Sequence, residues 1–256
     1  MQDSSKFEVI SEPIGQVCRT VEDRINRFLL KMKNQKILDE TNYNELHASG
    51  SGPGVLYGKP KIHKPDFNIK FQYRPILAAY NLASYNLAKF LVPILSPITS
   101  NKYTILNSKT FAEQIQSIPQ ADKFFMASFD VESLFTNIPL NETIEIILQK
   151  YFSISNTTFN GFTRSMFKTL LELAVNNTIF IFNNSFYRQT EGLGMGSPLG
   201  PTFANIFMCN FEEKWLSHCP LQFKPVHYYR YLDDTFLLFK ENSNVLFSLS
   251  TSTGSI

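Results

Sequence analysis

The pattern of apolar and polar residues along the chain predicts both helices and strands. Some stretches repeat apolar residues every three or four positions, as helices do, and others are short apolar runs, as strands are. Over residues 17–38, apolar side chains recur every three or four positions, which is typical of an amphipathic helix. Further helices are predicted over residues 83–91, 140–152, 163–176 and 201–217, with Asn141 as the N-cap of the second. Shorter apolar runs predict a strand over 123–130 and hairpins over 178–189 and 228–239.

The order of these elements predicts the fold class. A strand, two helices, a hairpin, a glycine-rich turn, a helix and a final hairpin follow one another after residue 120. This order is typical of an α+β fold with an antiparallel sheet backed by helices. Residues 48–58 are dense in Gly, Ser and Pro, which predicts a linker and a domain boundary after an N-terminal helical segment at 1–50.

Length and composition exclude several classes of protein. The 256 residues include 43% apolar and 18% charged residues, which indicates a globular chain. No apolar run approaches the roughly 20 residues of a membrane helix, and the N-terminus lacks the features of a secretory signal. Cys18, Cys209 and Cys219 are too widely spaced for a disulfide framework or a zinc knuckle. We therefore predict an intracellular protein with no membrane partner.

The small net charge of +2 is distributed unevenly. Within residues 55–74, basic residues are interleaved with aromatic ones, and Asp66 is the acidic residue among them. Such a cluster suits contact with phosphate groups. The alternative is a solvated basic loop. The basic residues are Lys59, Lys61, Lys64, Lys70 and Arg74.

Two adjacent carboxylates, Asp233 and Asp234, lie inside the apolar run of residues 228–239. Aspartate is a poor strand former, and unit charges about 4 Å apart repel by roughly 4 kcal/mol at an effective dielectric near 20. One interpretation is that the pair forms the tip of a hairpin. The other is that the pair faces a divalent cation. This stretch alone favours the turn.

A third carboxylate, Asp130, ends the strand predicted over 123–130. If that strand and the hairpin of Asp233 and Asp234 are neighbours in one sheet, the three carboxylates could surround two Mg²⁺ ions. Ions about 3.5 to 4 Å apart are used for in-line displacement at phosphorus. Mg²⁺ needs few protein ligands, because water and substrate phosphates supply the rest.

Six motifs occur in an order and spacing that can be compared with known families. They are LYGKPKIHKP (56–65), RPI (74–76), SYNLAKFL (84–91), SFDVESLFTNIPL (128–140), QTEGLGMGSPLGPTFANIFM (189–208) and YRYLDDTF (229–236). From about Leu56 to Phe239 the chain resembles the reverse transcriptase of Penelope-like retroelements. The resemblance implies a right-hand polymerase fold, with fingers at 51–120 and a palm at 121–256.

The resemblance also implies an activity, RNA-directed DNA polymerisation. Its substrates would be an RNA template, a DNA primer and deoxynucleoside triphosphates, with two Mg²⁺ ions, or Mn²⁺ in their place, as cofactors. Metal ligation is implied for Asp130, Asp233 and the backbone carbonyl of Val131. Asp234 matches a position that such enzymes need at the site but use less constantly as a direct ligand.

Nucleotide contacts are implied for two further groups of residues. Arg74 matches the fingers arginine that lies on the incoming triphosphate, and Lys59 and Lys61 would help to contact triphosphate or template. In the glycine-rich turn, Gly196, Ser197 and Pro198 would let the backbone approach template and nucleotide.

Phe135 has two interpretations, and Gly192-Leu193 departs from the pattern of most reverse transcriptases. Phe135 matches the aromatic gate that excludes a ribose 2′-hydroxyl, although a Phe packed in the core is the alternative. Gly192-Leu193 stands where most reverse transcriptases carry Gln-Gly, a departure expected of Penelope-like members. It leaves Gln189 as the candidate glutamine for nucleotide contact.

The residues after Lys240 resemble neither thumb helices nor a GIY-YIG endonuclease, so we expect a C-terminally truncated domain. A catalytically inactive nucleic-acid-binding remnant of a retroelement is the main alternative. An RNA-dependent RNA polymerase is disfavoured by Phe135, and no telomerase-specific RNA-binding region is recognisable. The family resemblance implies a nuclear location, and the sequence does not predict an oligomeric state.

Overall fold

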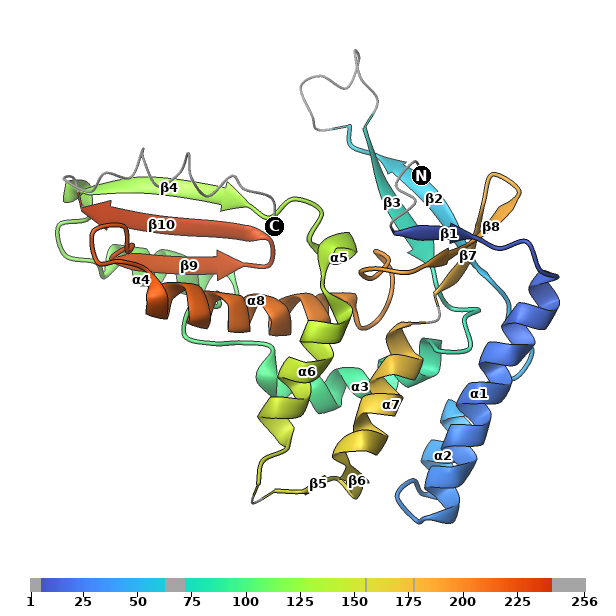
Figure 1. Ribbon diagram of the computed structural model, residues 1–256. Coiled ribbons are helices and arrows are strands. Elements are labelled where there is room, and N and C mark those ends of the chain that lie inside the picture. Colours follow the sequence, from blue (N-terminus) through green and yellow to red (C-terminus); the bar gives the residue numbers. More distant parts are fainter. Residues whose placement is uncertain (1–5, 63–71, 155, 177, 241–256) are drawn as a thin grey trace. The chain divides into compact units, whose positions relative to one another are not determined.

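The computed structural model describes residues 6–62, 72–154, 156–176 and 178–240 (Figure 1). The chain forms two compact units, each built from two stretches of sequence. The first unit comprises residues 1–98 and 135–204, and the second comprises 99–134 and 205–256. These units do not test the predicted division by function, which stays a prediction. That division has an N-terminal segment at 1–50, fingers at 51–120 and a palm at 121–256.

The first unit contains a five-stranded sheet in the order β1-β8-β7-β2-β3. Neighbouring strands are antiparallel, except that β2 and β7 are parallel. The predicted hairpin of β7 and β8 is confirmed, and Asn183 and Asn184 both adopt positive φ at its tip, at 47° and 60°. Asparagine tolerates this conformation. The strands are β1 (Phe7–Val9), β2 (Gly54–Pro60), β3 (Tyr73–Ala78), β7 (Ile179–Phe182) and β8 (Ser185–Gln189).

The linker predicted over residues 48–58 is wrong in its second half, because β2 begins at Gly54. A Cβ atom at Gly54 would lie 2.9 Å from the backbone carbonyl oxygen of Ala78 on the neighbouring strand. Glycine at this position therefore permits the close approach of two strands. Glycine thus occurs here inside a strand, and its presence in the sequence does not by itself indicate a loop.

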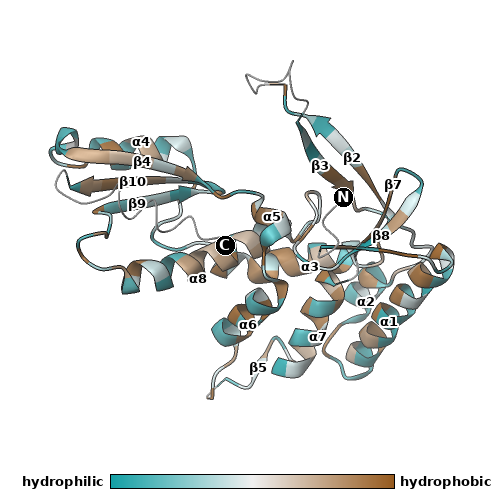
Figure 2. Cartoon of the chain, turned by 45° about the horizontal axis from the view of Figure 1, so that its top comes forward, coloured by the Kyte–Doolittle hydropathy of each residue, from teal (hydrophilic) through white to brown (hydrophobic). Residues whose placement is uncertain are grey.

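The helices of the first unit confirm the predicted ones, with shifted ends. The long N-terminal helix α1 carries basic residues in its last turn, and its polar and apolar faces are visible in Figure 2. The predicted cap Asn141 is wrong, because Pro139 is the N-cap of α6 and Asn141 already lies in the first turn. The helices are α1 (Ile14–Asn34), α2 (Glu40–Leu46), α3 (Tyr85–Leu95), η1 (Ser96–Ile98), α5 (Leu134–Asn137), α6 (Leu140–Tyr151) and α7 (Arg164–Val175).

An aromatic cluster joins the ends of α6 and α7. Phe167 of α7 is fully buried, and its ring centroid lies 5.6 to 6.0 Å from those of four other aromatic rings. These rings come from the end of α6 and from the small hairpin of β5 (Thr158–Phe159) and β6 (Phe162–Thr163). The cluster therefore closes the long connection between the two helices. Its other members are Tyr151, Phe152, Phe159 and Phe162.

The second unit contains a three-stranded antiparallel sheet in the order β4-β10-β9. The strands are β4 (Phe124–Asp130), β9 (His227–Tyr231) and β10 (Asp234–Lys240). The central strand, β10, is mostly hydrophobic along its middle, whereas β9 is mostly hydrophilic (Figure 2). The predicted strand and hairpin are thus confirmed, and both belong to one sheet.

Helices pack on both faces of this sheet. On one face, Leu216 of α8 (Gly200–His218) forms a buried cluster with Tyr228, Leu237 and Phe239. On the other face, Phe111 of α4 (Ser108–Gln116) contacts the rings of Tyr229 and Phe236. A short 3-10 helix, η2 (Ala121–Lys123), leads into β4.

The two units together confirm the predicted α+β class, with an antiparallel sheet backed by helices. Among the helices in the described ranges, none combines the length and the apolar character that crossing a membrane requires.

Candidate catalytic and nucleotide-binding sites

The hairpin of β9 and β10 turns at Leu232 and Asp233. Tyr231 pairs with Asp234, so the loop consists of the two residues between them. The prediction that Asp233 and Asp234 form the tip is therefore shifted by one residue, and Asp234 is the first residue of β10. Leu232 has a φ of 56°, a left-handed conformation that costs a non-glycine residue about 1–3 kcal/mol. Other contacts must stabilise this turn.

The three predicted carboxylates lie at one end of the three-stranded sheet. Asp130 at the end of β4 is directly opposite Asp234 at the start of β10. Opposite residues of an antiparallel pair point to the same face, with Cβ atoms about 4.5–5.5 Å apart. Both side chains are exposed, and that of Asp233 is half-buried. The backbone N–H of Val131 donates to the carbonyl oxygen of Asp233 at 3.0 Å, which joins β4 to the turn.

The chemistry of this donor set fits a divalent cation. Like charges directly opposite each other destabilise a strand pair, and a bound cation removes this repulsion. Carboxylate oxygens are the ligands that Mg²⁺ prefers, and it takes its remaining ligands from water and phosphates. Within the described residues, no group of three or more His, Cys, Asp or Glu side chains is placed to hold a metal ion. The structure thus shows the opposed pair of Asp130 and Asp234, and metal binding by the three carboxylates stays a prediction.

A side-chain bond fastens the two strands beside the carboxylates. Thr235 follows Asp234 and pairs with Phe129, so its side chain is on the opposite face of the sheet. Its hydroxyl donates to the backbone carbonyl of Phe129 at 3.0 Å, and the residue is buried. The ends of β4 and β10 are therefore tied together next to Asp130.

Beneath the same turn, an ion pair lies fully buried between β9 and α8. Arg230 Nε donates to Glu212 Oε1 at 2.5 Å, and neither side chain is exposed. The hydroxyl of Tyr228 donates to the same oxygen at 3.2 Å, and Asn101 Nδ2 donates to Glu212 Oε2 at 3.0 Å. Burial and the neighbouring Glu212 carboxylate raise the pKa of Tyr228 far above its usual value. Tyr228 is therefore a donor at any physiological pH.

This ion pair was not predicted from the sequence. A signal was nevertheless available, because alternation along β9 places Arg230 on the same buried face as Tyr228. A buried charge needs a partner of opposite charge, and its partner Glu212 is eighteen positions earlier in the chain, on a helix. The periodicity of α8 alone does not distinguish that glutamate from its exposed neighbour Glu213.

In the first unit, the structure brings two of the predicted nucleotide-binding residues together. Lys59 of β2 is directly opposite Arg74 of β3, and both side chains are exposed. These two cations are a like-charge pair that an anion would stabilise. Lys61 follows β2, and its backbone N–H donates to the carbonyl of Gln72 at 2.8 Å. The other basic residues of the cluster, Lys64 and Lys70, lie outside the described residues.

Within the first unit, the glycine-rich turn packs closely against β3. Gly196 has a φ of 121°, and a Cβ atom there would lie 2.1 Å from the backbone oxygen of Leu77 on β3. The N–H of Leu77 in turn donates to the carbonyl of Met195 at 2.7 Å. Ser197 donates its N–H to Gly194, and both Ser197 and Pro198 are half-buried. Close packing on β3 thus requires glycine here, and the approach to a nucleotide stays a prediction.

Phe135 and Gln189 each have structural contacts within the first unit. Phe135 in α5 is half-buried, and its ring lies beside Gly200, where a Cβ atom would be 3.4 Å from Cδ1. The gate and the packing interpretations of Phe135 therefore both stay open. Gln189 is buried, and its Nε2 donates to the carbonyl of Glu191 at 2.9 Å. This contact holds the start of the glycine-rich turn.

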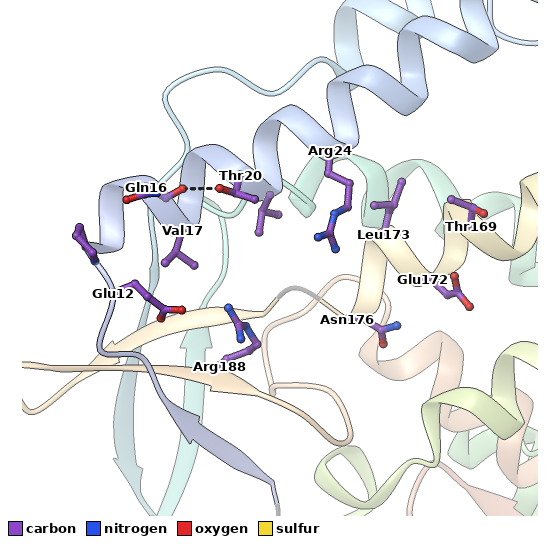
Figure 3. A pocket seen from close by; sticks show the side chains of 12 residues that line it. Glu12, Gln16, Val17, Thr20, Arg24, Thr169, Glu172, Leu173, Asn176 and Arg188 are labelled. Atoms are coloured by element: carbon purple, nitrogen blue, oxygen red, sulfur yellow. Dashed lines mark hydrogen bonds between the residues drawn. The ribbon is translucent and has the colours of Figure 1, made fainter.

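A separate pocket of about 660 Å³ lies between α1, α7 and β8 (Figure 3). Arg24 and Arg188 extend into it, with Glu12 and Glu172 also on its wall. Arg188 forms an ion pair with Glu8 at 2.9 Å. None of the site residues predicted from the sequence lines this pocket.

Comparisons with known proteins indicate the family of the chain. Residues 62–252 match the family model described as reverse transcriptase (RNA-dependent DNA polymerase). A search of curated proteins finds no match.

Among solved structures, the chain is similar to fungal telomerases. The telomerase of Candida albicans, in complex with the TWJ fragment of telomeric RNA, has a TM-score of 0.54 and 11% identity, over 78% of this chain and 40% of that one. The apo telomerase of Candida tropicalis has a TM-score of 0.54 and 12% identity, over 97% of this chain and 48% of that one. The chain thus spans less than half of the length of either structure, and the likeness concerns the polymerase fold.

The matched region covers both the opposed carboxylates and the strand that carries Arg74. Since it includes well over half of the sequence, this chain belongs to the reverse transcriptase family.

Proposed function

We propose that the chain is the RNA-directed DNA polymerase domain of a Penelope-like retroelement. It would add deoxynucleotides to the 3′-hydroxyl of a DNA primer, directed by an RNA template. One observation carries the proposal: Asp130 is directly opposite Asp234 on one face of the three-stranded sheet, with Asp233 in the adjoining turn. The six motifs, together with Gly192-Leu193 in the glycine-rich turn, support the Penelope-like assignment.

In this proposal the carboxylates bind two Mg²⁺ ions, or Mn²⁺ in their place. Asp130, Asp233 and the carbonyl of Val131 are the direct ligands, and Asp234 supports them from the opposite strand. The chemistry supplied by bound divalent cations is activation of the primer hydroxyl and charge stabilisation of the leaving pyrophosphate.

The opposed cations of the first unit bind the triphosphate of the incoming nucleotide. Arg74 presents a planar guanidinium that matches phosphate oxygens, and Lys59 adds a second charge directly across the strand pair. Lys61 contacts triphosphate or template from the end of β2. The repulsion within the cation pair is relieved by the substrate, as the repulsion within the carboxylate pair is relieved by metal.

The sugar and base of the nucleotide would contact the aromatic and glycine-rich segments of the first unit. Phe135 acts as the gate that excludes a ribose 2′-hydroxyl. Gly196, Ser197 and Pro198 present backbone to the nucleotide, because Gly196 is exposed and its close packing on Leu77 fixes the turn against β3.

The first test is primer extension with the whole chain on poly(rA)/oligo(dT) and Mg²⁺. We expect product from the wild-type chain and a loss of at least about 100-fold for Asp233→Asn, because metal binding supplies several kcal/mol and about 1.4 kcal/mol changes a rate tenfold. Asp122→Asn is the matched control, since Asp122 is an exposed carboxylate just before the other end of β4. Its rate should equal that of the wild-type chain.

The opposite result would support a catalytically inactive remnant. In that case no product forms, and Asp233→Asn leaves salt-sensitive binding of nucleic acid unchanged. Binding would then be lost only when Lys59 and Arg74 are replaced, because these cations contact phosphate without any metal.

A second test measures the repulsion between the opposed carboxylates. Without metal, Asp234→Asn should raise the melting temperature by about 1–4 °C, because a like-charge cross-strand pair costs roughly 0.2–1 kcal/mol. With saturating Mg²⁺, the wild-type chain should gain more stability than the variant, since metal stabilises the state that binds it. Thermal melting in EDTA and in Mg²⁺ gives both values. A variant that melts below the wild-type chain in EDTA would show that the pair is not repulsive.

The third test concerns Phe135. Replacing it with Ala should increase the use of ribonucleotides relative to deoxynucleotides at least about tenfold, which is the scale of a steric clash of 1.4 kcal/mol or more. The readout is the ratio of kcat/KM for the two nucleotides. Phe182→Ala is the control, because Phe182 is an exposed phenylalanine in the same unit. An unchanged ratio for Phe135→Ala would mean that the ring serves only in packing.

A further inference from the structure

Arg230 has a position that its ion pair alone does not explain. Its three guanidinium nitrogens donate to four acceptors. Nε donates to Glu212, Nη1 donates to Asn205 Oδ1 at 2.8 Å and to the backbone carbonyl of Leu232 at 3.0 Å, and Nη2 donates to Cys209 Sγ at 3.5 Å. Its own backbone is also held, because its N–H donates to Tyr103 at 2.9 Å and its carbonyl accepts from Ile105 at 2.8 Å. The backbone of Arg230 is therefore held by two hydrogen bonds, and its side chain extends from there to the turn.

The bond to Leu232 acts on the peptide that precedes Asp233. A peptide unit is planar, so fixing the carbonyl of Leu232 fixes the plane that contains the nitrogen of Asp233. On the other side of Asp233, its own carbonyl accepts the N–H of Val131 at 3.0 Å. Both peptide planes that flank Asp233 are thus held by hydrogen bonds, one from Arg230 and one from β4.

The turn needs such support because of its backbone conformation. Leu232 is in the left-handed region, where a leucine is disfavoured by about 1–3 kcal/mol. Without the guanidinium, the turn could relax toward a less strained conformation, which would move the Asp233 carboxylate relative to Asp130. The hydrogen bond from Arg230 stabilises the strained form.

Stability of the unit does not account for a buried ion pair at this place. Removing two charges from water is costly, and replacing such a pair with apolar residues of similar volume is often neutral or stabilising. Leu216, Leu237 and Phe239 already supply an apolar core next to it. The pair therefore provides something that an apolar core cannot, namely a donor directed at the carbonyl of Leu232.

We propose that Arg230, oriented by Glu212, is a positioning residue for the metal site. It holds the Leu232–Asp233 peptide so that the Asp233 carboxylate is preorganised to share a divalent cation with Asp130. The inference rests on the metal-binding role of these two aspartates in the proposed function. Glu212 acts through Arg230; its carboxylate also accepts hydrogen bonds from Asn101 and Tyr228, but neither of these bonds is to the turn and the proposal assigns neither residue a positioning role.

Two variants separate positioning from folding. Arg230→Met combined with Glu212→Leu removes both charges together and keeps the buried volume filled, so the unit should still fold. Arg230→Lys keeps a cation beside Glu212, but a compact ammonium with three donors does not reproduce the planar guanidinium, whose three nitrogens reach four separate acceptors. Tyr228→Phe is the matched control, because it removes a hydrogen bond to Glu212 that does not involve the turn.

The first readout is Mn²⁺ binding to the whole chain, titrated by electron paramagnetic resonance, with cooperative melting as the check on folding. We expect the Kd for Mn²⁺ to rise about 10–100-fold in the double variant and in Arg230→Lys, the range found for residues that orient metal ligands. Tyr228→Phe should stay within about twofold of the wild-type chain. A folded Arg230 variant with unchanged affinity would overturn the proposal.

The second readout does not depend on metal. Hydrogen exchange at the Val131 amide, measured by nuclear magnetic resonance without divalent cations, reports the bond between β4 and the carbonyl of Asp233. Exchange should accelerate at least about tenfold in both Arg230 variants and remain unchanged in Tyr228→Phe. Slow exchange in the Arg230 variants would refute the positioning role. If the wild-type chain binds no Mn²⁺ but exchange accelerates as expected, the proposed metal site fails while the positioning of the turn stands.

Discussion

The pairing of β4 with β10 is the constraint on which the rest of the site depends. It runs without interruption from Asp234 opposite Asp130 to Lys240 opposite Phe124. Side chains alternate between the faces of a sheet, so a shift by one residue would move Asp130 to the opposite face from Asp234. The buried residues Leu237 and Phe239 fix this register, because they must pack against Leu216 of α8. Hydrophobic packing therefore holds two like charges together.

The same electrostatic arrangement occurs twice in the chain, with opposite signs. Asp130 and Asp234 are opposed in the second unit, and Lys59 and Arg74 are opposed in the first. All four side chains are exposed, so ions from solution can reach them. Strand pairs normally place opposite charges across from each other, because like charges are destabilising. A protein that binds both a divalent cation and a triphosphate gains from each arrangement when its ligand is present.

The sequence predicted the strands and the turn of the site better than it predicted which of them are neighbours in space. The apolar run ending in Asp130 and the hairpin around Asp233 were identified, because alternation and turn residues are local signals. The cap of α6 and the strand β2 were not, since Pro139 and Gly54 act through backbone geometry and close packing rather than through periodicity. The pairing of Asp130 with Asp234 required the assumption that their strands are neighbours, which only tertiary structure settles.

The buried network of Arg230 and Glu212 shows a further reason why sequence reasoning falls short. A charge on a buried face is visible in the pattern, but its partner depends on how a helix is placed against the sheet. Glu212, the partner of Arg230, also determines in which direction the guanidinium can donate its other hydrogen bonds. With Glu212 bound at Nε, the Nη1 atom of Arg230 is directed at the turn, and the strained residue Leu232 accepts its hydrogen bond. Under the proposed function, the position of Asp233 therefore depends on Arg230 and Glu212, which would contact neither substrate nor metal.

The central claim is that Asp130 and Asp233 share a divalent cation, and affinity cleavage tests it most directly. Fe²⁺ replaces Mg²⁺ at such sites, and with ascorbate and peroxide it generates radicals that cut the nearby backbone. The account predicts cuts next to residues 130 and 233, both suppressed by excess Mg²⁺ and both lost in Asp130→Asn. Cuts elsewhere only, or cuts at these positions that neither Mg²⁺ nor Asp130→Asn removes, would contradict it.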